Sequence, residues 1–333
     1  MTKEAIFEIN SSEAFLEAAL ELFVYQYDNN AVYGEFCRRI GLHDPKRVQR
    51  LDQIPFLPIS FFKTHKIRTG TFDPEMVFVS SGTTGTGDSQ HFIRSLKLYE
   101  DAFNHSFAHF YGDPSEYTIL ALLPHYLERQ NSSLLYMMDY LIRHSESPHS
   151  GFYLYNHQDL FYHLEMLKKG AGKVLLFGVT FALLDFEEHY ALDYPDLIVM
   201  ETGGMKGMRT ELVKEEVHAR LKKGFGVEKI HSEYGMCELT SQAYSLGDNL
   251  FQTPPWMKMI VRDQKEPLPS RETDAVERVE PTTGVINIID LANRDSCAFI
   301  ATEDLGRRTP EGAIELLGRA DYTQVRGCNL LVI

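Results

Sequence analysis

The 333-residue chain lacks the features that mark several specialised classes of protein, and each absence excludes one class. Its four cysteines, Cys37, Cys237, Cys297 and Cys328, have neither the spacing of a zinc site nor that of a small disulfide framework. Lys and Arg total 33 against 47 Asp and Glu, and the resulting net charge of −14 argues against a general nucleic-acid-binding protein. The longest apolar stretches, such as residues 174–184, fall short of the about 20 residues that a membrane span needs. The sequence predicts a cytoplasmic globular protein with reduced thiols, no membrane span and no nucleic-acid partner.

Through the middle of the chain, short apolar runs alternate with helical patterns. Continuous apolar runs are typical of strands that are covered on both faces, and they occupy residues 76–80, 117–123, 173–178 and 197–201. The ranges predicted as helices are 94–111, 131–145, 157–169, 180–192 and 210–223. This alternation predicts an α/β fold in which a parallel-type sheet is layered with helices.

The two ends of the chain differ from this middle part. Residues 11–41 have helical spacing, with Asn10 and Ser11 available as caps, and they are followed by a proline-punctuated extended segment at 54–59. After residue 250 prolines break up the chain, and strand-like runs follow at 257–261, 285–289, 313–317 and 325–333. We therefore expect a single domain with three segments, which are a helical N-terminal segment at 1–70, an α/β core at 71–250 and a β-rich subdomain at 251–333.

A loop of glycines and hydroxyl residues directly follows the apolar run at 76–79. It consists of Ser80, Ser81, Gly82, Thr83, Thr84 and Gly85. Glycines let the backbone turn tightly, and successive N–H and hydroxyl groups then form a concave set of donors that suits a polyphosphate. A polar surface loop has the same composition. The Gly-x-x-x-x-Gly-Lys-Ser/Thr sequence of ordinary P-loop ATPases and kinases is absent from the chain, which excludes that class.

Two further segments have residue types suited to a nucleotide. Gly203 and Gly204 follow a predicted strand, where paired glycines let a flat base lie against the backbone, although a plain turn has the same sequence. In the segment 233–238, the ring of Tyr234 can stack on a base and the carboxylate of Glu238 can hold Mg²⁺ beside phosphates. Core packing with a solvated glutamate is the alternative for this segment.

The last two motifs contain an acidic and a basic residue. Asp304 lies in the segment 302–307, and Arg319 lies in Gly-Arg-Ala-Asp at 318–321. An aspartate can accept both hydroxyls of a ribose, and an arginine can neutralise phosphate, but either residue could equally belong to a surface ion pair.

The order of these five motifs resembles that of the acyl-adenylate-forming superfamily, over roughly residues 76–328. The resemblance implies an ATP site in which residues 80–85 bind pyrophosphate and Glu238 holds Mg²⁺. It implies adenine contacts from Gly203, Gly204, Tyr234, Gly235 and Met236. It further implies that Asp304 binds the ribose and that Arg319 lies near ribose and phosphate.

Within that superfamily the chain looks most like the acyl-protein synthetases, the fatty-acid-activating component of bacterial bioluminescence. The resemblance rests on the segments 54–63, 123–127, 131–134 and 326–328. It implies that Cys328 accepts the acyl group, and the neighbouring Arg326 would favour the thiolate, whereas a small buried side chain is the alternative. His125 corresponds to a position near the substrate carboxylate, and a hydrogen-bonded loop histidine is the alternative. Phenylacetate-CoA ligases are the next most similar group.

The chain departs from the superfamily pattern in two places. The phosphate loop continues without the usual lysine, so charge on the phosphates must come from Mg²⁺ or from another cation such as Lys206 or Arg319. The sequence also ends at Ile333, just past the hinge position, so we expect the mobile C-terminal lid domain to be absent.

These observations predict an ATP- and Mg²⁺-dependent ligase that converts a small carboxylic acid to an acyl-adenylate, releasing pyrophosphate and then AMP. The acyl group would pass to a thiol, either Cys328 or that of an acceptor protein such as a reductase or carrier. One alternative is a CoA ligase of the phenylacetate type that uses a partner domain. Another is a nucleotide- or acyl-binding protein with little catalysis. The sequence does not specify which acid is the substrate or which oligomeric state the protein adopts, and a homo-oligomer is one alternative.

Overall fold

The computed structural model describes residues 4–80, 87–124, 131–203, 212–263 and 280–320. Eight α-helices lie in these ranges: α1 (Ser12–Asn29), α2 (Ala31–Arg39), α3 (Phe61–Thr64), α4 (Leu96–Tyr111), α5 (Ser133–His144), α6 (His157–Leu167), α7 (Thr180–His189) and α8 (Lys214–Phe225). None of these helices combines the length and apolarity that crossing a bilayer requires.

Most of the strands in the described ranges belong to one sheet. The strands are β1 (Leu57–Pro58), β2 (Met76–Val79), β3 (Gln90–Ile93), β4 (Tyr117–Leu122), β5 (Gly151–Tyr153), β6 (Lys173–Val179), β7 (Ile198–Thr202), β8 (His231–Tyr234), β9 (Ala243–Ser245), β10 (Leu250–Gln252), β11 (Met257–Arg262), β12 (Thr283–Asp290), β13 (Phe299–Arg308) and β14 (Ile314–Arg319). The large sheet has the order β11-β12-β13-β14-β10-β9-β8-β7-β6-β4-β5, and β1 pairs with β13 outside this path.

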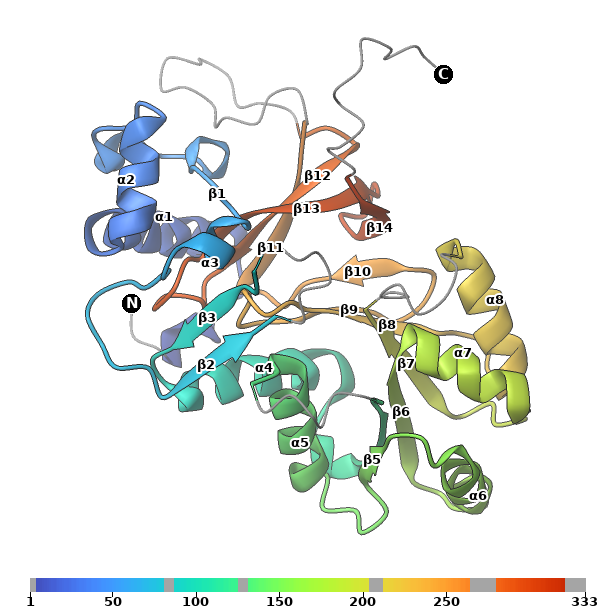
Figure 1. Ribbon diagram of the computed structural model, residues 1–333. Helices are drawn as coiled ribbons and strands as arrows, with labels where there is room; N and C mark the ends of the chain where they lie inside the picture. Colours follow the sequence, from blue (N-terminus) through green and yellow to red (C-terminus); the bar gives the residue numbers. More distant parts are fainter. Residues whose placement is uncertain (1–3, 81–86, 125–130, 204–211, 264–279, 321–333) are drawn as a thin grey trace.

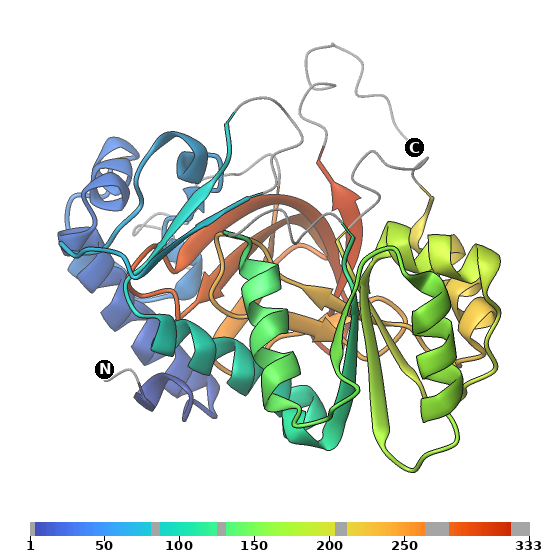
Figure 2. The ribbon, with the colours of Figure 1, turned by 60° about the horizontal axis from the view of Figure 1, so that its bottom comes forward.

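The layered α/β core that the sequence predicts is present. Strand β4 pairs in parallel with β5 and β6, and the parallel pairing continues through β7 to β8. Helices α4 and α5 cover one face of these strands, and α6, α7 and α8 cover the other (Figures 1 and 2). The strands bury their side chains on both faces, which explains why they read as continuous apolar runs. Their carboxyl ends meet at one edge of the sheet, where ligands bind in open α/β folds.

The first predicted strand, at 76–80, has a different place from the one its apolar run indicates. It is β2, which pairs antiparallel with β3 in a separate two-stranded sheet. The residues between the two strands are those of the predicted phosphate loop. A strand at this position therefore presents the loop rather than extending the parallel sheet.

From β8 onward the sheet continues with antiparallel pairs. The predicted strands at 257–261, 285–289 and 313–317 are β11, β12 and β14, whereas 325–333 lies outside the described residues. Strand β10 pairs with both β9 and β14, which makes the C-terminal strands continuous with the core sheet. The division of the domain into three segments remains a prediction.

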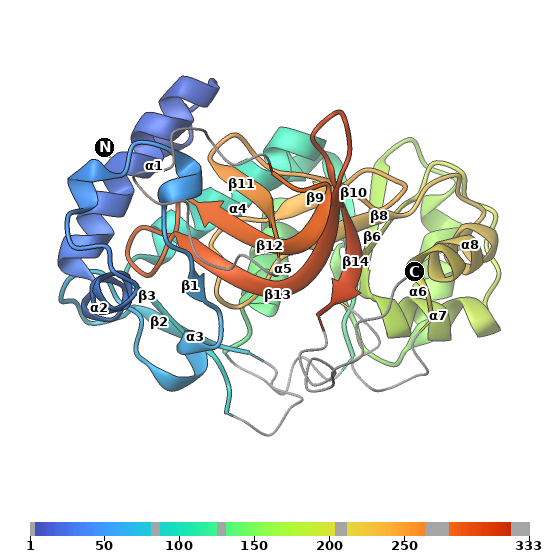
Figure 3. The same cartoon turned by 90° about the horizontal axis from the view of Figure 1, so that it is seen from above.

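The N-terminal helices cover the C-terminal strands. The predicted helical range at 11–41 consists of α1 and α2, and Ser11 caps α1 by accepting a hydrogen bond from the N–H of Ala14 at 3.1 Å. The ring of Phe23 in α1 packs against Phe299 of β13 with centroids 6.0 Å apart. Helices α1 and α2 thus lie beside β11, β12 and β13 (Figure 3), and residues from the start of the chain complete the core under its last strands.

Candidate active site

Strands β2 and β3 are the two stems of the predicted phosphate loop. Ser80 follows β2, and its N–H donates to the carbonyl of Ser89 at 3.0 Å, while the N–H of Ser89 donates to Oγ of Ser80 at 2.8 Å. These paired bonds hold the two ends of the loop together. Ser81, Gly82, Thr83, Thr84 and Gly85 lie outside the described residues, so phosphate binding by the loop remains a prediction.

Gly203 lies directly after β7, at the carboxyl edge of the parallel sheet. Its φ of 68° is in the left-handed region, which glycine adopts without the cost that a Cβ would impose. The hydroxyl of Thr180, the first residue of α7, lies 2.9 Å from the carbonyl oxygen of Gly203 and 2.6 Å from Oε2 of Glu201. The backbone at the predicted adenine site therefore sits against a buried polar network. Gly204 and Lys206 lie outside the described residues.

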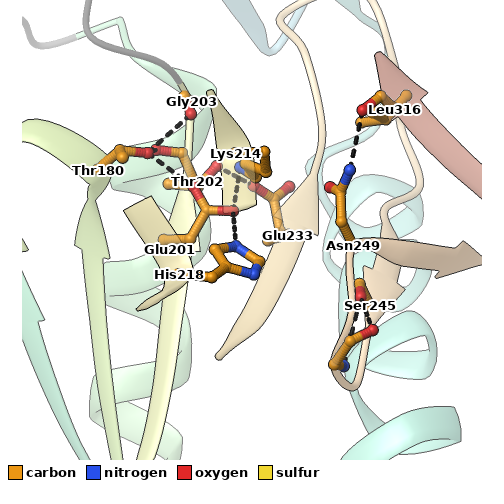
Figure 4. A network of polar contacts seen from close by, with 11 residues as sticks. Thr180, Glu201, Thr202, Gly203, Lys214, His218, Glu233, Ser245, Asn249 and Leu316 are labelled. Carbon is orange, nitrogen blue, oxygen red and sulfur yellow. Dashed lines mark hydrogen bonds and ion pairs between the residues drawn. The ribbon is translucent and has the colours of Figure 1, made fainter. Parts of the chain in front are cut away.

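That network centres on the carboxylate of Glu201, which is 1% exposed (Figure 4). Lys214 of α8 donates to its Oε1, and Nε2 of His218 lies 3.7 Å from the same oxygen. Burial alone would raise the pKa of this carboxyl, but the Lys214 ammonium and the neighbouring His218 outweigh burial and lower the pKa to about 2. The sheet edge under Gly203 thus contains an ionised carboxylate held by a buried ion pair.

Three of the predicted nucleotide-binding residues come together on neighbouring strands. The hydroxyl of Tyr234, at the end of β8, donates to Oδ2 of Asp304 in β13 at 2.7 Å. Nε of Arg319 in β14 lies 3.3 Å from the other carboxylate oxygen, Oδ1, because Asp304 and Arg319 are directly opposite each other in the β13–β14 register. Burial raises the pKa of Tyr234, and the Asp304 carboxylate raises it further, so the hydroxyl remains a donor. Tyr234 and Arg319, which are 70 and 15 positions from Asp304 in the sequence, therefore orient its carboxylate.

The next residue, Gly235, lies directly against the side chain of Glu233. A Cβ at this position would lie 2.2 Å from Oε1 of Glu233, well inside van der Waals contact. The Glu233 carboxylate in turn accepts a hydrogen bond from the hydroxyl of Thr202 in β7. Met236 is half-buried and packs against the apolar cluster of the C-terminal strands. A side chain at 235 would therefore require the Glu233 carboxylate to move from its contact with Thr202.

Glu238 is a buried carboxylate at the base of the phosphate loop. It is 5% exposed, and burial raises its pKa, although a hydrogen bond from Ser89 and the charges of Arg319 and Lys63 act in the opposite direction. A desolvated carboxylate beside the loop stem suits a hard cation, since Mg²⁺ takes one or two carboxylates and fills its other positions with water and phosphate oxygens. Within the described residues no group of three or more His, Cys, Asp or Glu side chains forms a metal site by itself. The donor set fits a metal that is carried by a nucleotide.

Besides Lys206, two other residues proposed for catalysis lie outside the described residues. His125 and Cys328, together with Arg326, lie outside the described residues, and their roles remain predictions. The other three cysteines, Cys37, Cys237 and Cys297, are buried free thiols. Burial raises the pKa of each of these thiols, which makes them poor nucleophiles.

Sequence reasoning missed two charged groups near the site. The first is the Glu201–Lys214 pair, whose only signal was a glutamate at the end of an otherwise apolar strand. The second is Lys63 of α3, whose ammonium is close enough to Glu238 to lower the pKa of that carboxyl. Lys63 belongs to the predicted N-terminal signature at 54–63, and its position beside the phosphate loop follows only from the packing of α3 against β3.

Comparison with solved structures identifies the fold. The chain is similar to ATP-bound MatB from Rhodopseudomonas palustris, with a TM-score of 0.52 and 15% identity over 73% of this chain and 47% of that one. It is similar to an ATP-bound RpMatB–BxBclM chimera, with a TM-score of 0.53 and 14% identity over 75% of this chain and 49% of that one. The chain thus spans about half the length of these structures. The predicted layered α/β fold is confirmed, since the protein has the acyl-adenylate-forming fold, and the absence of a C-terminal lid domain stays a prediction.

Comparison with curated proteins agrees with the more specific resemblance. The chain is 22% identical to the long-chain-fatty-acid–luciferin-component ligase of Aliivibrio fischeri, over 93% of this chain and 85% of that protein. It is 23% identical to the ligase of the same name from Vibrio harveyi, over 92% of this chain and 84% of that protein. No family model matches the sequence. The similarity to the acyl-protein synthetase type that the motifs indicate is therefore confirmed.

Proposed function

We propose that this protein is an ATP-dependent ligase that activates a fatty or other small carboxylic acid as an acyl-adenylate and then transfers the acyl group to a thiol. The observation that carries the proposal is the convergence of Tyr234, Asp304 and Arg319 beside the buried Glu238 and the stems of the Ser80 loop. The ligases from Aliivibrio fischeri and Vibrio harveyi support a long-chain fatty acid as the substrate. The ATP bound in the two similar structures supports the nucleotide.

The first step joins the acid to AMP. A carboxylate oxygen of the substrate, already ionised at neutral pH, attacks the α-phosphorus of ATP and displaces pyrophosphate, so no general base is required. The protein's part is to position the reactants and to balance charge. Asp304 accepts the ribose hydroxyls, Arg319 lies near the phosphate, and Gly203 with Tyr234 and Met236 bounds the adenine. Mg²⁺, when held by Glu238, shields the phosphate charge from the incoming carboxylate.

The second step moves the acyl group to sulfur. A thiolate attacks the acyl carbonyl carbon, the bond to the phosphate oxygen breaks, and AMP leaves with the electron pair. We propose Cys328 as the acceptor, with Arg326 favouring its thiolate form. His125 lies near the substrate carboxylate in this scheme, and Lys206 or Lys63 supplies the positive charge that the loop lacks. An acceptor protein then takes the acyl group from the cysteine.

Mass spectrometry of the intact protein tests both steps. The protein is incubated with Mg²⁺, ATP and a series of carboxylic acids of increasing chain length, with and without CoA, and the products are analysed for AMP and for a mass increase of one acyl group. We expect an adduct that hydroxylamine removes and that is lost in Cys328→Ala. In Cys328→Ser, any ester formed should resist neutral hydroxylamine, which controls for the chemistry of the bond. AMP formation that requires CoA and leaves no adduct would instead indicate the CoA-ligase alternative. Absence of AMP with every acid would indicate a binding protein.

A further inference from the structure

The segment that carries Glu238 is buried but belongs to no strand. Residues 235–242 connect β8 to β9 without ladder hydrogen bonds, and residues 237–242 are all buried. Buried backbone N–H and C=O groups must find partners elsewhere, because leaving one without a partner costs as much as a lost hydrogen bond. The partners of this segment therefore decide where its side chains point.

On the Glu238 side, two side chains from distant parts of the sequence supply those partners. Nδ1 of His91, in β3, lies 2.8 Å from the carbonyl oxygen of Cys237, and Nδ2 of Asn293 donates to the carbonyl of Glu238 at 2.8 Å. His91 is 1% exposed and Asn293 is 2% exposed. Burial lowers the pKa of His91 to about 4, so the ring is neutral and carries one N–H. We assign this proton to Nδ1, which faces the carbonyl of Cys237 at 2.8 Å, rather than to Nε2, which lies 3.1 Å from Oδ1 of Asn293.

The His91 ring and the backbone of Asn293 are each held by neighbouring elements. The edge of the His91 ring packs against Phe62 of α3, with centroids 6.3 Å apart and planes at 86°. The carbonyl of Asn293 accepts from Nε2 of Gln26 in α1 at 3.0 Å, and its N–H donates to the carbonyl of Asp290 at 3.0 Å. The two donors are therefore held by elements on either side of the segment.

On the far side of Glu238, a buried carboxylate holds the next turn of the chain. Oδ2 of Asp290, at the end of β12, accepts the N–H groups of Thr240 at 2.8 Å and Ser241 at 2.9 Å. Its Oδ1 accepts the Ser241 hydroxyl at 2.8 Å and the N–H of Ala292 at 3.2 Å. Asp290 is 0% exposed, and four donors satisfy both of its oxygens. Backbone positions 237, 238, 240 and 241 thus all bind buried side chains.

We propose that His91, Asn293 and Asp290 act together as positioning residues that aim the Glu238 carboxylate toward the loop stem at Ser89, where it receives the magnesium of Mg·ATP. The inference rests on the proposed function of Glu238 as the Mg²⁺ ligand. The loop stem at Ser89 and the metal carboxylate are then positioned together, because His91 lies in β3, directly after that stem. None of the three side chains needs to touch substrate.

The first test is independent of catalysis. Amide hydrogen exchange is measured on the peptide 236–242 in the nucleotide-free protein, for the wild type, His91→Phe and Asn293→Ala. His91→Phe keeps an aromatic ring against Phe62 and removes the two contacts of the ring nitrogens, with the Cys237 carbonyl and with Oδ1 of Asn293. We expect each variant to exchange at least about tenfold faster in this peptide, which corresponds to one hydrogen bond. His91→Gln, which can still donate to a carbonyl, should recover part of the protection. Exchange that is unchanged in this peptide would overturn the proposal.

The second test asks whether the segment aims the metal ligand. The Mg²⁺ concentration for half-maximal ATP binding is measured for Asn293→Ala, for Glu238→Gln and for the double variant. We expect Asn293→Ala to raise the midpoint about tenfold in the wild-type background and to change it less than twofold in the Glu238→Gln background. Asn30→Ala is the matched control, because Asn30 is 1% exposed and its Nδ2 also donates to a carbonyl, that of Ser296 at 2.9 Å, which does not belong to the segment 237–241.

The outcomes distinguish a failure of the proposed function from a failure of the positioning role. If the wild type binds no ATP at any Mg²⁺ concentration, the proposed function is wrong and the positioning role falls with it. If the wild type binds Mg·ATP but Asn293→Ala and Asn30→Ala shift the midpoint equally, only the positioning role is wrong. Full additivity of Asn293→Ala and Glu238→Gln would contradict it as well.

Discussion

The buried ion pair under Gly203 gives the sharpest prediction about stability. The Glu201 carboxylate is 1% exposed and receives the Lys214 ammonium, whose side chain is 29% exposed. Removing one partner of a buried pair leaves an uncompensated charge, which typically costs about 3–5 kcal/mol. Because Lys214 is partly open to water, we take the lower end and expect Lys214→Met to lower the free energy of unfolding by about 3 kcal/mol.

The reverse truncation should cost much less. Glu201→Gln removes the buried charge itself, and the lysine can then turn toward water, so the loss should be about 1 kcal/mol, near the value of one hydrogen bond. In the double variant the stranded charge no longer exists, so we expect a total loss of about 2 kcal/mol and a coupling free energy of about 2 kcal/mol.

Urea denaturation at neutral pH, followed by circular dichroism, measures the three variants. The matched control is Lys173→Met, since Lys173 and Glu116 form an ion pair whose side chains are 53% and 52% exposed. Surface pairs contribute little, so this control should lose less than about 1 kcal/mol. If Lys214→Met destabilises the protein no more than Lys173→Met, the Glu201 network is not the electrostatic support that we describe.

Three further predictions concern the surroundings of the site. Burial and then the nearby Lys229 charge lower the pKa of His231 to about 4. Between pH 6.5 and 4, His231 is therefore protonated in the unfolded chain but not in the folded protein. The contribution of His231 to the free energy of unfolding is therefore complete above pH 6.5, and up to about 3 kcal/mol of it is lost as the pH falls from 6.5 to 4. The free energy of unfolding should depend less steeply on pH in His231→Gln. Equal pH dependence in the wild type and the variant would contradict the assignment. Gly235→Ala places a methyl group 2.2 Å from Oε1 of Glu233, so we expect weaker ATP binding and a lower melting temperature, and an unchanged protein by both measures would show that the turn has room. Lys63→Ala should raise the KM for Mg·ATP about tenfold while Lys63→Arg largely preserves it, and equal effects of both substitutions on KM would remove Lys63 from the site.

The sequence predicts the layered core because each buried strand there is a short apolar run followed by a helical pattern. Strand β13 was not predicted, since Thr302, Glu303, Asp304 and Arg307 interrupt its apolar character. The structure explains Asp304, whose carboxylate Tyr234 and Arg319 orient. By contrast, Thr302 donates to the carbonyl of Ile286, and Arg307 pairs with Glu315. Because β13 carries polar residues, it lacks the continuous apolar run from which the other strands are predicted.

The residues that support the site were harder to predict than those that form it. Tyr234, Asp304 and Arg319 were identified because their motifs occur in the order that a known superfamily shows. His91, Asn293 and Asp290 have no local signal, because the backbone groups of residues 237–241 that they bind are between 49 and 146 positions away in the sequence. Likewise, no periodicity in α1 indicates that Gln26 bonds a turn 267 residues later. Such contacts follow from the three-dimensional fold alone.

Acid-dependent exchange of labelled pyrophosphate into ATP tests the central claim most directly, because it reports formation of the acyl-adenylate before any thiol is involved. With Mg²⁺ present, we predict exchange that depends on a carboxylic acid, that persists in Cys328→Ala and that falls by at least about tenfold in Glu238→Gln. Exchange with no acid in the series, under conditions in which the protein is folded and binds ATP, would contradict the account.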